Sequence, residues 1–400
     1  MRKILPDPDY AFKKINWANI LFFTVTGVGG LGVMPFYLHR NGFVLSDWIL
    51  FAVYFVCSGL SITAGYHRLY AHRTYQARPL LQLFLLFFGA SAFEQSALKW
   101  SSQHRNHHLY LDTERDPYSI TKGFWHAHMG WLVGWDRTKN FENVADLRQN
   151  ALIVHQHAHF KLWAIGAGIV TPVLIGALAG HALGAFLIGV CFRIVFVQQM
   201  TFCINSFCHL IGTANYDPST SARDHWFIAL LTFGEGYHNF HHRFPSDYRN
   251  GIRWYHWDPS KWAISLFRRA GQAYNLRKAP YFHILHARLA SQNRQVRLRL
   301  AQKLSRHPDF IRFNRAFERH YQKLQRAFSS FQSAATEYQR LVRAKVASRA
   351  SVEGIKKTAL ENLRARKEAF RSTYQKWVRY IEARLAVEAL PLQADKRGIS

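Results

Sequence analysis

Acidic residues and cysteines are both scarce in this chain, and each scarcity excludes a class of protein. The 400 residues contain 24 Asp and Glu against 52 Lys and Arg, which gives a formal net charge of +28. Such an excess of cations favours anionic partners such as lipid headgroups, phosphate-bearing substrates, acidic proteins or nucleic acid. The four cysteines show no CxxC pair and no disulfide-framework spacing, so we expect a reduced protein that faces the cytoplasm.

The positive charge is unevenly distributed, which argues against nucleic acid as the partner and divides the chain in two. Residues 291–400 hold 25 Lys and Arg against 9 Asp and Glu, a net charge of +16, and the first 290 residues contribute the remaining +12. The first part also holds nearly all of the long apolar runs. We therefore expect a membrane domain over residues 1–290 and a basic extension over residues 291–400.

Four apolar runs approach the roughly 20 residues that a helix needs to cross a bilayer. They lie at about 18–38, 48–64, 162–179 and 183–202, and short links join the first pair and the second pair. If both links face outward, the remaining segments with almost all Lys and Arg share the cytoplasmic side. The N-terminus lacks a small-residue cleavage pattern, so we expect the first run to be a retained anchor. The apolar stretch 80–100 contains Glu94 and is expected to form a buried or interfacial helix.

Histidines recur in four groups that lie where the expected spans emerge at the cytoplasmic face. The stretch EGYHNFHH places three histidines at i, i+3 and i+4, so they share one face of a helix, and HRNHH repeats this spacing. HRLYAH contributes two more histidines, and NSFCH contributes one histidine and an asparagine one helical turn before it. The set is His67, His72, His104, His107, His108, Asn205, His209, His238, His241 and His242.

Nine imidazoles exceed what one metal ion can use, and they suit two adjacent ions with open positions. Nitrogen-rich ligation without thiolates favours iron and oxygen chemistry, whereas zinc is normally satisfied by three or four ligands. The sequence therefore predicts a dinuclear metal centre. His126 and His128 are expected to line it behind the ligands. The alternating group His155, His157 and His159 is expected at the membrane interface.

With these motifs the sequence resembles the membrane-bound fatty acid desaturases, and within them the delta-9 acyl-CoA desaturase group. The resemblance covers about residues 15–275 and is carried by GYHRLYAHRTY, HRNHHLYLDTERDPYS, GFWHAHMGWL, NSFCH and RDHWFIALLTFGEGYHNFHHRFPSDYRNG. It implies an all-α integral membrane fold, with four transmembrane helices and a cytoplasmic helical cap. It also implies that the nine histidines hold two iron ions, one of them reached by Asn205 through a water. A bent apolar tunnel is implied as well, with candidate walls at Trp100, Phe124, Trp125, Trp131, Phe233 and Tyr237.

The function that this resemblance implies is an O2-dependent desaturase that introduces a cis double bond into a long saturated acyl chain, most simply at carbon 9 of an acyl-CoA. The cytochrome b5 motif His-Pro-Gly-Gly is absent, since Asp309 follows His307 and Pro308. We therefore expect a separate electron donor of ferredoxin, rubredoxin or cytochrome b5 type. Gln103 and Ser102 stand where the family commonly has an acidic residue and a basic one near the CoA headgroup, so acyl-lipid or carrier-bound acyl groups stay open.

Two other classes of function also stay open. A membrane di-iron hydroxylase of alkanes or sterols shares such histidine motifs, although the context of Asp112, Asp116 and Pro117 favours a desaturase. A membrane metal transporter or storage scaffold places ionisable ligands within the membrane, whereas these histidines lie at the ends of the spans.

The last 110 residues lie outside the resemblance, and they carry aromatic and aliphatic residues at spacings of three and four. One series begins at Phe310 and ends at Phe331, and a second begins at Leu363 and ends at Leu385. This periodicity predicts two long amphipathic helices, with a break at Ser351–Gly354 between them. We expect a helical hairpin.

Overall fold

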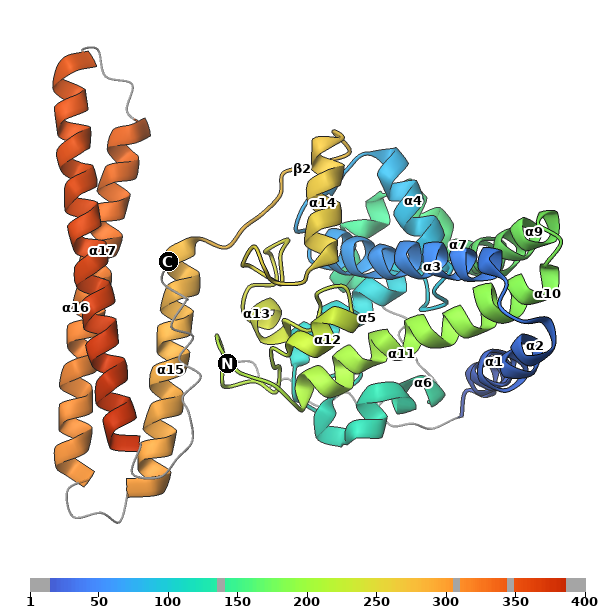
Figure 1. Cartoon of the computed structure of the whole chain (residues 1–400), viewed down its shortest axis with the longest axis horizontal. Coiled ribbons are helices and arrows are strands. Elements are labelled where there is room, and N and C mark those ends of the chain that lie inside the picture. The colour runs from blue at the N-terminus through green and yellow to red at the C-terminus, as the bar shows by residue number, and fades with distance from the viewer. Residues whose placement is uncertain (1–14, 135–140, 305–309, 344–348, 386–400) are drawn as a thin grey trace. The chain divides into compact units, whose positions relative to one another are not determined.

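A computed structural model describes residues 15–134, 141–304, 310–343 and 349–385, and these residues are mostly helical (Figure 1). The chain divides into two compact units, Met1–Pro280 and Tyr281–Ser400. The α-helices of the first unit are α1 (Trp17–Gly27), α2 (Met34–Asn41), α3 (Leu45–Leu60), α4 (Pro79–Ala90), α5 (Ala97–Tyr110), α6 (Trp131–Val133), α7 (Ala151–Ala158), α8 (Phe160–Ile165), α9 (Thr171–Leu178), α10 (Ala182–Gly184), α11 (Arg193–Ser206), α12 (Trp226–Leu231), α13 (His238–Arg243) and α14 (Pro259–Arg269).

Four helices in the described residues are long and apolar enough to cross a bilayer, so the predicted multi-pass membrane fold is confirmed. Each of them contains one π-helical stretch beside its α-helical segments. In chain order these stretches are Val28–Val33, Ser61–Ala71, Gly166–Val170 and Ala185–Phe192. The four spans are Trp17–Asn41, Leu45–Ala71, Phe160–Leu178 and Ala182–His209.

The second and fourth spans are longer than the bilayer requires. They contain 27 and 28 residues, whereas about 20 residues cross a hydrocarbon core of about 30 Å. His67 and His209 lie close to the C-terminal ends of these two spans.

Arg193 lies in the fourth span and is fully buried, as expected for a cation that is costly in contact with lipid. Its guanidinium donates to the carbonyl oxygens of Gly189 at 2.8 Å, Ser91 at 2.6 Å and Gly168 at 2.9 Å. It also lies 3.4 Å from Oγ of Ser58. These bonds join the second, third and fourth spans to the loop that follows α4.

The apolar stretch 80–100 is not a single helix, in contrast to the expectation from sequence. Helix α4 ends at Ala90 and α5 begins at Ala97. Between them, Phe93 and Gln95 have φ angles of 58° and 76°, in the left-handed region that interrupts a helix of L-residues. Glu94 lies between these two residues and is 9% exposed.

The rest of the first unit consists of short helical turns, two short strands and the remaining helices. Short 3-10 turns lie at Ile120–Lys122, Glu142–Val144, Leu147–Gln149 and Phe207–His209, and His126–Gly130 is π-helical. Two short strands, β1 (Gln76–Ala77) and β2 (Ala273–Tyr274), pair antiparallel. Helix α14 packs against the second span through buried Ile264, which belongs to the same apolar cluster as Ile62 and Leu69.

The second unit has three helices in its described part, α15 (Tyr281–Leu304), α16 (Phe310–Arg343) and α17 (Arg349–Leu385). Most residues of the two predicted aromatic series lie in its core, in which Phe317 and Phe328 of α16 cluster with Phe370 and Trp377 of α17. The predicted hairpin therefore corresponds to α16 and α17, and α15 adds a third helix.

Two boundaries differ from the sequence expectation. The units divide at Pro280 rather than at residue 290, because α15 begins at Tyr281 and its Leu285 and Leu289 belong to the second core. The expected break at Ser351–Gly354 lies within α17.

Candidate metal centre

The structure brings the nine predicted histidines together from four separate segments of the chain. Within each of two groups, the candidate ligand atoms lie within 4.8 Å of one another. The first group is His67, His72, His104, His108 and His241, and the second is His107, His209, His238 and His242. Helix α5 and helix α13 each contribute to both groups, so the two groups are adjacent.

Within each group, Nε2 atoms face one another at short distances. In the first group, Nε2 of His241 lies 3.0 Å from Nε2 of His67 and 3.0 Å from Nε2 of His108. In the second group, Nε2 of His238 lies 3.0 Å from Nε2 of His209 and 3.0 Å from Nε2 of His242. Two ligands at a right angle, with metal–nitrogen bonds of about 2.1 Å, are separated by about 3.0 Å. The observed spacings therefore fit ligation of one ion by each group.

In His67 and His107, the ring proton lies on Nδ1 rather than on Nε2. Nδ1 of His67 is 2.8 Å from the carboxylate of Glu235, and Nδ1 of His107 is 2.8 Å from the carboxylate of Asp116. These acceptors hold the proton on Nδ1, so Nε2 presents a lone pair. Nε2 of His107 is buried and has no hydrogen-bond partner within the described part of the chain.

His209 follows the same rule through a hydroxyl relay. The Oγ of Ser221 donates to the carboxylate of Asp112, so it accepts the proton of His209 Nδ1 at 2.7 Å. The lone pair of His209 Nε2 then points at His238. Lone pairs that converge in this way repel one another unless a cation lies among them, and the donor set therefore fits bound metal ions.

Burial keeps most of the nine imidazoles neutral. Desolvation, with a further contribution from neighbouring histidines, lowers the pKa well below the usual value for histidine. This holds for His72, His104, His108, His238, His241 and His242. Neutral imidazole is the form that binds metal, so the site is ready for ligation at physiological pH.

A buried ionic network holds the first group in place. Glu235 accepts from Arg68 at 2.9 Å and from Nδ2 of Asn250 at 2.6 Å, and Arg68 also contacts Asp258 at 3.0 Å. Although burial raises the pKa of Glu235, His67 and Arg68 together hold it below its usual value. Sequence reasoning missed Glu235, and the available signal was its position three residues before His238 in the same motif.

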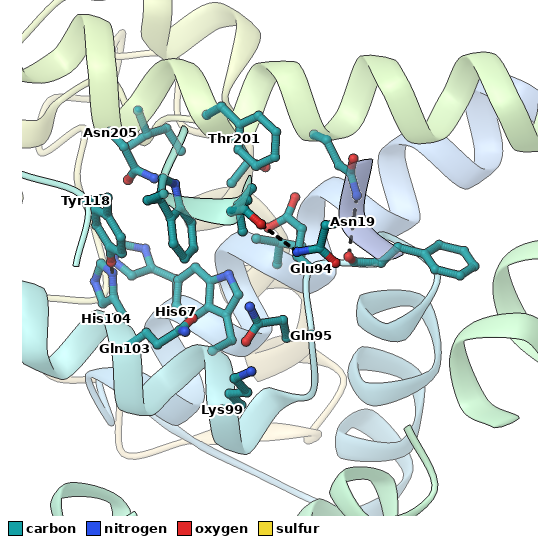
Figure 2. Close-up of a pocket in the computed structure, with 18 of the residues that line it drawn as sticks. Asn19, His67, Glu94, Gln95, Lys99, Gln103, His104, Tyr118, Thr201 and Asn205 are labelled. Carbon is teal, nitrogen blue, oxygen red and sulfur yellow. Dashed lines mark hydrogen bonds between the residues drawn. The ribbon is translucent and has the colours of Figure 1, made fainter. Parts of the chain in front are cut away.

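A cavity of about 390 Å³ lies beside the histidines (Figure 2). His67, His104 and His238 line it together with Asn205, which belongs to neither histidine group. Apolar side chains form much of the remaining wall: Phe22, Phe23, Ile62, Phe93, Trp100, Trp131, Leu132, Phe202 and Ile204. A second, smaller pocket shares Thr63, Thr201 and Ile204 with this cavity and is lined by Phe233.

Polar residues of this cavity lie at several points on its wall. Figure 2 shows Glu94, Gln95, Lys99 and Gln103 along the segment that leads from the loop after α4 into α5. Gln103 therefore reaches the cavity, whereas Oγ of the neighbouring Ser102 donates to Asn143 at 2.8 Å.

The other histidines singled out from the sequence lie outside the two groups. His128 bonds to Oγ of Ser206 at 2.9 Å and to Gln199 at 3.0 Å, which joins it to α11. His155 accepts from the indole of Trp163 at 3.2 Å on an exposed face. These contacts are ordinary hydrogen bonds.

Four membrane helices and two adjacent histidine groups beside a largely apolar cavity define a class, the multi-pass membrane proteins with a histidine-rich metal centre. The sequence profile described as Fatty acid desaturase matches residues 46–278, and the chain belongs to this family.

Curated relatives agree with this placement. The chain is 43% identical over 274 residues to a protein named Probable acyl-CoA desaturase from Schizosaccharomyces pombe, an alignment that covers 67% of this chain and 56% of that protein. It is 39% identical over 294 residues to Acyl-CoA desaturase 1 of Saccharomyces cerevisiae, covering 72% and 57% respectively. It is 32% identical over 266 residues to the sn-1 stearoyl-lipid 9-desaturase of Anabaena variabilis, covering 66% and 95%. The chain thus spans little more than half the length of the two yeast relatives.

Proposed function

We propose that the protein is an oxygen-dependent fatty acyl desaturase that introduces a cis double bond into a long saturated chain, at carbon 9 of an acyl-CoA. The observation that carries this proposal is the cavity whose wall is shared by aromatic side chains and by histidines of both metal groups. Such a cavity holds an apolar chain against the place where the metals would act. Relatives named acyl-CoA desaturases support the reaction and the substrate class.

Two iron ions are the proposed cofactors, one in each histidine group, with Asn205 holding a water beside the second group. Iron supplies the redox chemistry with O2 that no side chain provides. The reaction removes two hydrogens from adjacent CH2 groups and consumes O2, two electrons and two protons to give an alkene and two waters. The imidazoles of His67, His107 and His209, held by Glu235, Asp116 and Ser221, would fix the positions of the ions.

The cavity wall orients the acyl chain. Each CH2 group that leaves water contributes about 0.8 kcal/mol, so contact with side chains such as Phe22, Phe93 and Trp100 favours a long chain over a short one. No acid, base or nucleophile is needed from the protein, because the position of the chain relative to the metals decides which carbons react.

Polar side chains on the cavity wall suggest the headgroup of the substrate, and the need for two electrons implies an electron donor. Lys99 and Gln103 line the cavity and are suited to hold a phosphate-bearing or carbonyl-bearing headgroup. The Anabaena relative is named as a lipid desaturase, so an acyl lipid is the alternative substrate. The two electrons come from a separate carrier protein. In this proposal the carrier binds on the cytoplasmic side of the membrane, where both chain termini and the histidines also lie.

Expression in a host that lacks its own desaturase tests this proposal. We expect new monounsaturated acyl chains with the double bond at carbon 9, and none with the His107→Ala variant at equal membrane abundance. A hydroxylated product in place of the alkene would identify the hydroxylase alternative. Bound metal without any oxygen-dependent product would leave a transport or storage function and overturn the desaturase.

A further inference from the structure

Helix α16 has two opposite faces of different chemistry. Its inner face is buried in the second unit and carries Phe317, Leu324 and Phe328. At 100° per residue, the opposite face carries five cations at successive spacings of three, four, four and three. This basic row consists of Arg312, Arg315, Arg319, Lys323 and Arg326, and all five residues are exposed.

The basic row has no anionic partner within the described part of the chain. None of its five side chains takes part in an ion pair or a side-chain hydrogen bond there. Other arginines of the same unit do find carboxylates. Arg297 lies 2.7 Å from Glu318, and Arg340 lies 3.0 Å from Glu337. The basic row therefore concentrates unpaired positive charge, whereas some other arginines of this unit are paired with carboxylates.

The form of the basic row favours a flat polyanionic surface over a protein partner. Protein interfaces are centred on apolar and aromatic anchors, and Ile311 is the single large apolar side chain exposed on α16 before Val342. Gln322 and Ser329, which lie between and beyond the cations, are polar and exposed. From residue 312 to residue 326 the row extends along about 21 Å of helix, which is a straight line of charge.

We infer that the basic row is a docking surface for the anionic lipid headgroups of the membrane in which the first unit is anchored. The four spans keep this bilayer within reach, because α15 begins directly after the first unit ends at Pro280. Tethering raises the effective concentration of the surface, so a modest intrinsic affinity is sufficient. The cations bind by electrostatic attraction to the headgroups, without insertion of apolar side chains. This inference does not depend on the proposed catalytic function.

The test uses the full chain in lipid nanodiscs and energy transfer from a dye on Gln322→Cys to acceptor-labelled headgroups. Cys57 and Cys203, which are half-buried, are replaced by Ala so that they do not take up dye. A dye on Gln375→Cys, an exposed position of α17 outside the basic row, serves as the control position. We expect transfer from position 322 to be larger in discs that contain phosphatidylserine than in phosphatidylcholine discs. The difference should disappear in high salt, because the attraction is screened.

Charge-neutralised variants make the assignment specific. The combined change Arg315→Gln, Arg319→Gln and Lys323→Gln should shift the docking equilibrium on the order of a hundredfold, at about a fivefold loss per cation. The matched control Arg364→Gln, Arg366→Gln and Arg379→Gln removes the same charge from exposed positions of α17 and should leave docking unchanged. Equal transfer in both disc types, or equal loss in both triple variants, would overturn the inference. A response at position 322 to soluble polyglutamate but not to anionic lipid would identify an acidic protein as the partner instead.

Discussion

Nδ1 of His67 lies 2.8 Å from Oε2 of Glu235, and this contact joins the end of the second membrane span to the last histidine motif. It fixes the ring so that Nε2 of His67 faces Nε2 of His241 at 3.0 Å. The same carboxylate accepts from Arg68, so the first histidine group is connected to a buried ion pair. The geometry of the first histidine group thus depends on an acid that belongs to neither group.

Replacing this acid should therefore weaken metal binding. Glu235→Gln removes the charge that holds the proton on His67 Nδ1 and leaves Arg68 less compensated. We expect a loss in metal affinity of about 10-fold to 100-fold, measured as metal retained against increasing chelator. Glu114→Gln is the control, because its side chain is 86% exposed and lies outside both groups. Equal retention by the two variants would contradict the positioning role.

The two histidine groups should lose metal separately. His241→Ala removes a nitrogen from the first group, and His107→Ala removes one from the second. Each variant should lose one of the two proposed ions, and both should lose desaturation while still inserting into membranes. Elemental analysis of purified protein measures this, with His155→Ala as a control on an exposed histidine. A variant that keeps full metal content and full activity would remove that histidine from the site.

Asn205 should matter for turnover more than for metal content. It lines the cavity one helical turn before His209, and a carboxamide is a weak ligand that suits a hydrogen bond to water. We expect Asn205→Ala to retain most of the metal and to lose most of the activity, with both quantities measured on the same preparation. Unchanged turnover would show that Asn205 only packs against its neighbours.

Glu94 should make the stability of the fold depend on pH. Burial raises its pKa to about 8, although Thr201 and Trp100 lower it by hydrogen bonding. The folded protein then holds a proton that the unfolded chain releases above about pH 4.3. The contribution of Glu94 to the free energy of unfolding is therefore largest below that pH and falls by about 1.4 kcal/mol per pH unit, until it levels off above pH 8.

Glu94→Gln removes this dependence while preserving the shape of the side chain. Relative to the parent, the variant should become more stable as pH rises from 5 to 9, as measured by thermal unfolding in detergent. Glu114→Gln should keep the parental slope. Parallel curves for the parent and Glu94→Gln would show that Glu94 is ionised in the folded state.

Removing the second unit should leave the chemistry intact. The units divide at Pro280, and all ten proposed site residues precede Arg243. A chain truncated after Pro280 should bind the same metal and give the same product, because no proposed ligand is lost. The rate with a protein donor and with a small chemical reductant should be compared in both forms. Failure of the truncated chain to hold metal would show that the second unit is part of the catalytic unit.

The properties that the sequence by itself determined are those that depend on short stretches of chain. The length and polarity of the four runs decide that they cross a bilayer, since about 20 apolar residues span the hydrocarbon whatever surrounds them. Helix geometry alone decides that His238, His241 and His242 share a face. The aromatic series of α16 and α17 likewise follows from the 3.6-residue period.

Tertiary structure alone decided how these pieces are combined. The division of nine histidines into a group of five and a group of four depends on Nε2 distances between segments that only packing brings together. No local pattern in the sequence predicts the contact between His67 and Glu235. Nor does one predict the loop in which Phe93 and Gln95 adopt left-handed φ angles. The boundary lies at Pro280 because Leu285 of α15 is buried in the core of the second unit. A helix belongs to the unit that buries its apolar face, and the sequence alone does not show which unit buries that of α15.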